Sequence, residues 1–172
     1  IRSSGYSRNV TLKKVFIKES KIVNLSFYES KIDTVYIEDG IINNLEFNNC
    51  KINKLIIKNC NSKLIEIKNS EIGNSRFIGG EFLNIEFLNN RTKSIDFGFF
   101  GYGNLRFKAG SISKMKLINL IPLDNISKIK FIESKLHLPR IKNTEVSNID
   151  FTRANIDFYN FQLLSDYKSD KG

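Results

Sequence analysis

Large apolar residues recur every five residues along most of this chain, and polar residues fill the positions between them. From Leu12 to Leu117 this central position departs from the pattern at Ser62 and Thr92, and mildly at Tyr102. A second column lies two residues before each centre and alternates between two kinds of residue. One set is large (Val15, Leu25, Val35, Leu45, Leu55) and the other is mostly small (Ser20, Ser30, Gly40, Cys50, Cys60).

Neither a helix nor a long strand explains a period of five. Five residues advance an α-helix by about 500°, so an apolar stripe would drift by about 140° at each repeat. In a continuous strand, residues five apart point to opposite faces. The period fits a short extended segment followed by a corner, with two side chains per unit pointing inward. Stacked coils then bury a shared axial core, which predicts an all-β solenoid.

The repeat shifts by one residue after Leu117 and then resumes. The later centres are Ile121, Ile126, Phe131, Leu136, Ile141, Val146, Phe151, Ile156 and Phe161. We therefore predict one β-helix domain over residues 10–161, with an irregularity near 118–126. Residues 1–9 are expected to form an N-terminal cap or tail, and residues 162–172 a C-terminal cap and a mobile tail. A short helix beginning at Phe161 would cover the last coil or form a homodimer contact.

The layout resembles the pentapeptide-repeat family. The stretch Ala154-Asn155-Ile156-Asp157-Phe158 carries the family motif of a small residue, an Asn and an apolar centre. Elsewhere the residue before the centre is usually charged or Asn, as in Lys21 and Glu71. Half of the positions at which the family motif has a small residue carry a large residue in this chain. The resemblance covers about residues 10–161. It implies a right-handed parallel β-helix with four walls, five-residue units, about 20 residues per coil and short terminal caps.

Residues 20 apart would then lie above one another. We expect one such column to occupy a left-handed corner, because Asn tolerates that backbone conformation; it contains Asn24, Asn44, Asn84 and Asn104. A second column would stack in the core and contains Phe27, Phe47, Phe87 and Phe107. Cys50 and Cys60 are expected to be buried, reduced thiols rather than a disulfide, which favours a cytoplasmic location. The chain begins with Ile1 rather than Met, so a secreted effector or a fragment of a larger protein stays open.

The chain is basic, with 27 Lys and Arg against 18 Asp and Glu and a net charge of +9. Such a charge attracts polyanions, although no block of five like charges occurs and most of the lysines are expected to be solvated. One basic column, with Lys31, Lys51 and Arg91 interrupted by Glu71, is a candidate strip for an acidic partner. Nucleic-acid binding is less favoured, because the pattern shows no exposed aromatic residues among the basic ones.

No constellation of catalytic residues is present. The single histidine, His137, follows a centre and is expected at the surface. No Gly-x-Ser-x-Gly is found, acidic residues are scattered, and Gly98–Gly103 does not match a phosphate-binding motif. No apolar stretch is long enough to span a membrane. The sequence therefore predicts a non-enzymatic protein without a cofactor or a metal site.

The leading interpretation is a scaffold or protein–protein interaction module. The apolar candidates for the contact are Leu64, Ile78, Leu83, Leu88 and Phe99. A module that binds nucleic acid or an acidic protein is the alternative. Some members of the pentapeptide-repeat family bind DNA gyrase as mimics of duplex DNA, and a net charge of +9 disfavours that role here.

Overall fold

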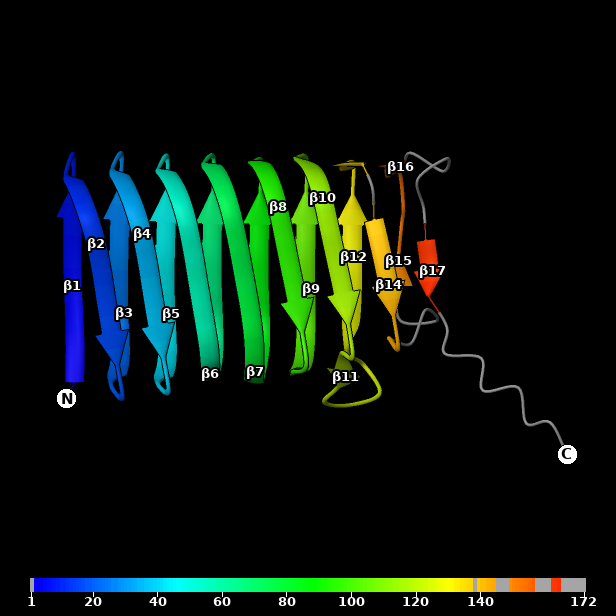
Figure 1. The fold of residues 1–172 in the computed structure, drawn as a ribbon, viewed down its shortest axis with the longest axis horizontal. Coiled ribbons are helices and arrows are strands. Elements are labelled where there is room, and N and C mark those ends of the chain that lie inside the picture. The colour runs from blue at the N-terminus through cyan, green and yellow to red at the C-terminus, as the bar shows by residue number, and fades with distance from the viewer. Residues whose placement is uncertain (1, 138, 145–148, 157–161, 165–172) are drawn as a thin grey trace, which may run out of the picture.

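A computed structural model describes residues 2–137, 139–144, 149–156 and 162–164, and shows a right-handed solenoid (Figure 1). Its strands are β1 (Arg2–Arg8), β2 (Thr11–Lys18), β3 (Lys21–Tyr28), β4 (Lys31–Glu38), β5 (Ile41–Asn48), β6 (Lys51–Lys68), β7 (Glu71–Leu88), β8 (Arg91–Gly98), β9 (Gly101–Lys108), β10 (Ser111–Ile118), β11 (Ile121–Pro122), β12 (Lys128–Ile132), β13 (Lys135–Leu136), β14 (Pro139–Lys142), β15 (Ile149–Asp150), β16 (Asn155–Ile156) and β17 (Gln162–Leu164). The pairings between these strands are parallel. No helix of the described segments is long and apolar enough to cross a membrane.

Each coil has four walls. In the block from residue 51 to 60 the buried side chains are Ile52, Leu55, Ile57 and Cys60. The inward residues are thus two apart along a wall and three apart around a corner, because two consecutive outward residues mark each change of direction. Register confirms about 20 residues per coil, since Lys31 pairs with Lys51. The five-residue units and the quadrilateral coil predicted from the pattern are therefore confirmed.

The walls are named here by their place in Figure 1. The front wall faces the viewer and comprises residues 14–18, 34–38, 54–58, 74–78, 94–98 and 114–118. The back wall comprises residues 24–28, 44–48, 64–68, 84–88, 104–108 and 128–132. The upper wall is shorter and includes residues 30–33, 50–53, 70–73, 90–93 and 110–113. The lower wall, which carries β11, includes residues 40–43, 60–63, 80–83, 100–103 and 120–123.

Only alternate corners use a left-handed backbone. The residue with positive φ recurs every tenth position, as in Asn49 (φ 55°), Asn59 (φ 49°) and Asn69 (φ 51°). Asn suits this conformation because its short side chain tolerates positive φ and bonds locally. The expectation that the Asn24 column is left-handed was wrong, since none of its residues has a positive φ. Asn104 Nδ2 nevertheless donates to Asn84 Oδ1 at 3.4 Å, so part of that column is a hydrogen-bonded ladder.

The core is filled by the inward columns. Phe27 stacks on Phe47 with ring centroids 5.3 Å apart, and Phe87 stacks on Phe107 at 5.2 Å, as expected. The thiols of Cys50 and Cys60 are buried and free. Burial raises the pKa of both thiols, and each lies within hydrogen-bonding distance of backbone oxygens.

Both ends of the described chain extend the sheet. Strand β1 covers the segment expected to be a cap or tail, and it pairs with β3 so that Gly5 lies opposite Leu25 and Ser7 opposite Phe27. Small residues at inward positions hid this strand from the apolar pattern. At the other end, the expected helix is wrong for Gln162–Leu164, because this segment pairs with β14 as β17. The homodimer contact was expected at the C-terminal cap, of which Phe161 and residues 165–172 lie outside the described residues.

One coil contains four extra residues. Ile121 pairs with Gly101, 20 residues earlier, whereas Lys128 pairs with Asn104, 24 residues earlier. The expected inward positions of Ile121 and Ile126 were wrong, since these side chains are 66% and 75% exposed. The later centres Phe131, Leu136 and Ile141 are buried as predicted. The irregularity is thus an insertion that leaves the next coils in register.

Candidate functional site

The inserted residues form a closed loop on the lower wall between β11 and β12. Asp124 Oδ1 accepts hydrogen bonds from the backbone N–H of Ile126 at 3.1 Å and from the Ser127 hydroxyl at 2.8 Å. The loop is also tied to the preceding coil, because the backbone N–H of Leu123 donates to the Tyr102 carbonyl at 2.9 Å. These bonds hold the loop in one place against the solenoid.

Large apolar side chains gather around this loop. They are between 36% and 75% exposed, and they are Leu83, Phe99, Ile121, Leu123 and Ile126. Strand pairing brings their coils together, since β9 lies between β7 and β11. A Cβ on Gly101 would lie 2.6 Å from Leu123 Cδ2, so the missing side chain leaves room for Leu123. These five residues are called the apolar patch below.

The sequence-predicted apolar residues do not all lie together. Leu83 and Phe99 belong to the apolar patch. Leu64 and Leu88 are half-buried in the back wall, and Ile78 is half-buried in the front wall. Leu83 and Leu88, although adjacent in the repeat, therefore face different sides of the rod.

The predicted basic column follows the upper wall. Lys31 lies opposite Lys51, Lys51 opposite Glu71, and Glu71 opposite Arg91. Lys51 Nζ is 3.4 Å from Glu71 Oε2, so an ion pair divides the column. Glu71 therefore interrupts the positive charge of this strip between Lys51 and Arg91.

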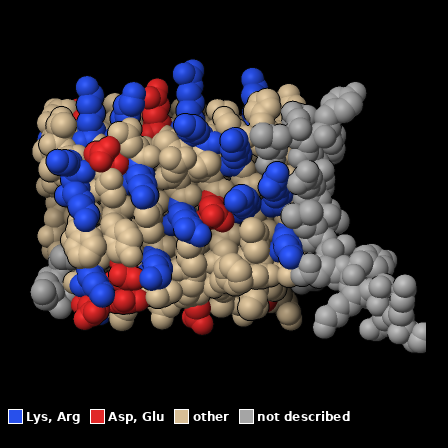
Figure 2. All heavy atoms as spheres, in the orientation of Figure 1, with Lys and Arg blue, Asp and Glu red and all other residues tan. Residues whose placement is uncertain are grey.

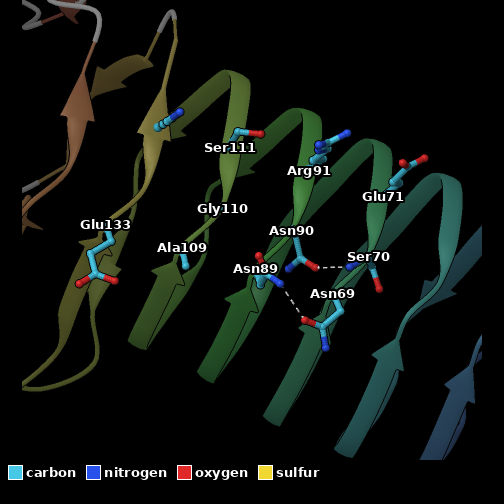
Figure 3. A pocket seen from close by; sticks show the side chains of 11 residues that line it. Asn69, Ser70, Glu71, Asn89, Asn90, Arg91, Ala109, Gly110, Ser111 and Glu133 are labelled. Atoms are coloured by element: carbon cyan, nitrogen blue, oxygen red, sulfur yellow. Dashed lines mark hydrogen bonds between the residues drawn. The ribbon is translucent and has the colours of Figure 1, made fainter.

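A hollow lies beside Arg91 in the upper wall (Figure 3). It exists because one coil carries small side chains, Ala109, Gly110 and Ser111, between coils that carry Arg91 and Glu133. Glu133 Oε1 is 3.2 Å from Arg153 Nη1, so its charge is already paired.

The amides below the rim of this hollow are also bonded. Asn90 Nδ2 donates to the Ile67 carbonyl at 2.7 Å, and its Oδ1 accepts from the backbone N–H of Ser70 at 2.8 Å. Asn89 Nδ2 donates to Asn69 Oδ1 at 3.0 Å (Figure 3). These amides stabilise the stacked corners, and this bonding explains why a polar Asn90 occupies an inward position.

Basic side chains spread over the front wall (Figure 2). They are Lys14, Lys18, Lys54, Lys58, Arg76, Lys114 and Lys116. Two acidic residues, Glu38 and Asp96, share this wall. Aromatic side chains lie among the lysines, since Phe16 is 55% exposed and stacks on Tyr36 with ring centroids 5.4 Å apart. The expectation that no exposed aromatic residue lies among basic ones was therefore wrong.

Ionised groups pair across neighbouring coils. Lys58 Nζ donates to Glu38 Oε1 at 2.7 Å, which lowers the pKa of Glu38 and raises that of Lys58. The Tyr28 hydroxyl donates to Glu46, which raises the pKa of Tyr28.

His137 is exposed. Among the residues with described positions, no group of three or more His, Cys, Asp or Glu is placed to hold a metal ion.

Sequence reasoning missed two features of these surfaces. Ile121, Leu123 and Ile126 were missed because the shift in the repeat had placed Ile121 and Ile126 inside. The pairing of Phe16 with Tyr36 was missed because only inward columns were followed across coils. A search of the outward columns at a spacing of 20 residues would have found it.

The pairing, burial and corners define the chain as a parallel β-solenoid of five-residue units, with the architecture of a pentapeptide-repeat protein. No family model and no curated protein matches the chain. Among solved structures, QnrB1, described as a plasmid-mediated fluoroquinolone resistance protein, aligns over 90% of this chain and 95% of its own, with 13% identity and a TM-score of 0.32. This likeness is too loose to carry a functional argument.

Proposed function

We propose that the protein is a non-enzymatic interaction module that binds a partner protein through the apolar patch. The observation that carries this proposal is the exposure of Leu83, Phe99, Ile121, Leu123 and Ile126 on neighbouring coils of the lower wall and its corner. A contiguous exposed apolar area costs solubility, and on folded proteins it commonly marks a contact site. Insertions in repeat proteins also commonly lie on the binding face.

The loop is suited to binding because it is already ordered by its own hydrogen bonds. Asp124 bonds both Ile126 and Ser127 within the loop. Ordering a flexible segment on association would cost about 0.5–1.5 kcal/mol for each immobilised side chain. A loop that is fixed before contact avoids much of this cost, so its apolar area contributes more directly to affinity.

The lower wall supplies a matched control for a test. Ile41 and Ile121 occupy the same outward column of this wall and are 51% and 66% exposed, but Ile41 lies outside the apolar patch. We expect Ile121→Asp to reduce the partner retained by the immobilised protein from a lysate of its source at least tenfold at high salt. Ile41→Asp should leave retention unchanged.

The outcome that contradicts the proposal is equal retention by both variants, or loss in the Ile41→Asp variant alone. Circular dichroism and a thermal melt of each variant would show whether the rod remains folded. Since both side chains point outward, both substitutions should leave the fold intact.

A further inference from the structure

We propose that the front wall binds the surface of an anionic phospholipid membrane, as a second interaction surface independent of the apolar patch. The rod would lie along the bilayer without crossing it. Two properties of the wall lead to this inference: its charge and its exposed apolar side chains.

The charge of the front wall is one-sided. Seven Lys and Arg face out from residues 14–118 of this wall, and Arg140 and Lys142 of β14 extend it, against two acidic residues, Glu38 and Asp96. Glu38 pairs with Lys58, and Asp96 Oδ2 lies 3.5 Å from Arg76. The back wall is more evenly charged, because Glu46, Glu66 and Glu86 stack along the middle of its strands. Five basic residues share that wall: Lys68, Arg106, Lys108, Lys128 and Lys130. Lys and Arg side chains clustered near an anionic bilayer are attracted to its negative surface potential.

An apolar band runs between these lysines. Phe16, Tyr36 and Ile56 follow one another in the central outward column. Ile78 and Ile118 lie in the next outward column, on two coils separated by the coil that carries Gly98. Lys side chains can keep their charge among lipid headgroups while their methylene stems cover apolar surface. Aromatic residues are enriched at the headgroup level of membranes, so this arrangement fits a lipid interface.

The geometry favours a membrane over a nucleic acid. Phe16 and Tyr36 stack nearly parallel, with 14° between their planes, and Lys14 Nζ lies 4.8 Å from the centroid of the Phe16 ring. Their faces are thus occupied, whereas single-strand binders stack bases on free aromatic faces. A duplex would place its phosphates against the exposed apolar side chains of this wall.

The test uses vesicles of phosphatidylcholine with or without phosphatidylserine. We expect the protein to sediment with the phosphatidylserine vesicles only, and to be released by salt. The double variant Lys54→Glu, Lys114→Glu should bind at least tenfold more weakly. The matched control, Lys108→Glu, Lys128→Glu, makes the same change in net charge with exposed lysines of the back wall and should bind nearly as the unchanged protein does. Phe16→Ser should also weaken binding.

Three outcomes would overturn the inference. These are no sedimentation with phosphatidylserine vesicles, equal weakening by the two double variants, or tighter binding of the front wall to single- or double-stranded DNA than to vesicles. The Ile121→Asp variant should bind vesicles normally. If the Ile121→Asp variant no longer binds the partner protein but still binds vesicles, the front wall and the apolar patch are separate binding surfaces.

Discussion

The rings of Phe107 and Phe131 stack with centroids 4.8 Å apart and 12° between their planes, although the inserted loop lies between them in the sequence. The loop leaves the solenoid on the lower wall and returns before the back wall, where Phe107 pairs with Phe131. Phe87 and Phe151 extend the same stack on either side. The core is therefore continuous through the irregular coil, and the insertion changes only the surface.

This continuity predicts that Phe107 is important for stability. Replacing Phe107, which is 2% exposed, with Ala removes a ring that contacts both neighbouring coils. We expect the free energy of unfolding to fall by about 3–5 kcal/mol, as for other buried Phe residues. The measurement is urea denaturation followed by circular dichroism. The control is Phe16→Ala, which removes an exposed ring and should lower the free energy of unfolding by less than about 1 kcal/mol. Similar losses of stability in the Phe107→Ala and Phe16→Ala variants would contradict a core that passes through the insertion.

A buried hydroxyl gives a prediction of opposite sign. Thr92 lies between Ile72 and Ile112 in an inward column, and its hydroxyl is buried with no hydrogen-bond partner. Thr92→Val keeps the shape and removes an unpaired polar atom, so we expect stabilisation by about 1–3 kcal/mol. The matched control is Thr144→Val, because the Thr144 hydroxyl donates a hydrogen bond to the Lys142 carbonyl at 3.2 Å. Loss of this hydrogen bond should destabilise the protein. Destabilisation by Thr92→Val in a thermal melt would contradict this view of the column.

The sequence predicted the solenoid well because its core has one simple rule. Nearly every inward position is apolar or small, with Asn90 and Thr92 as exceptions, and a period of five is incompatible with a helix or a long strand. The same rule misplaced Ile121 and Ile126. An insertion of four residues and a deletion of one produce the same phase in a five-residue repeat, so the pattern after Leu117 could not distinguish them. Only the pairing of Lys128 with Asn104 shows which occurred.

The candidate surfaces were less predictable, because outward residues obey no such rule. Leu83 and Phe99 were singled out as exposed apolar residues, but the partners that make them a patch come from the misassigned insertion. The basic column on the upper wall was traced correctly through Lys31, Lys51 and Arg91. The stronger concentration of charge lies on the front wall, where lysines of separate coils, such as Lys14 and Lys54, share one face only after the coils stack.

The thiols provide a test that depends on pH. Because burial raises the pKa of Cys50 and Cys60, the folded chain keeps these protons when the unfolded chain begins to lose them. The stabilising contribution of the protonated thiols is therefore complete below the usual thiol pKa of about 8.5 and is lost as pH rises through the raised folded values.

We expect urea denaturation under reducing conditions to show a smaller loss of stability between neutral and alkaline pH for Cys50→Ser, Cys60→Ser than for the unchanged protein. Alkylation of the folded protein should be on the order of a hundredfold slower than that of the unfolded chain, because reaction requires local opening. Equal alkylation rates in the folded and unfolded states would contradict the burial of these side chains.

Photo-cross-linking from the inserted loop tests the central claim most directly. A photoreactive phenylalanine analogue replaces Ile126, at the most exposed point of the apolar patch, and a second protein carries it at Ile41 as the reference. The partner-protein hypothesis predicts a specific cross-linked product from position 126 that is absent from position 41 and is reduced by Ile121→Asp. Equal products from both positions, or a product from position 41 alone, would show that the apolar patch is not the binding site.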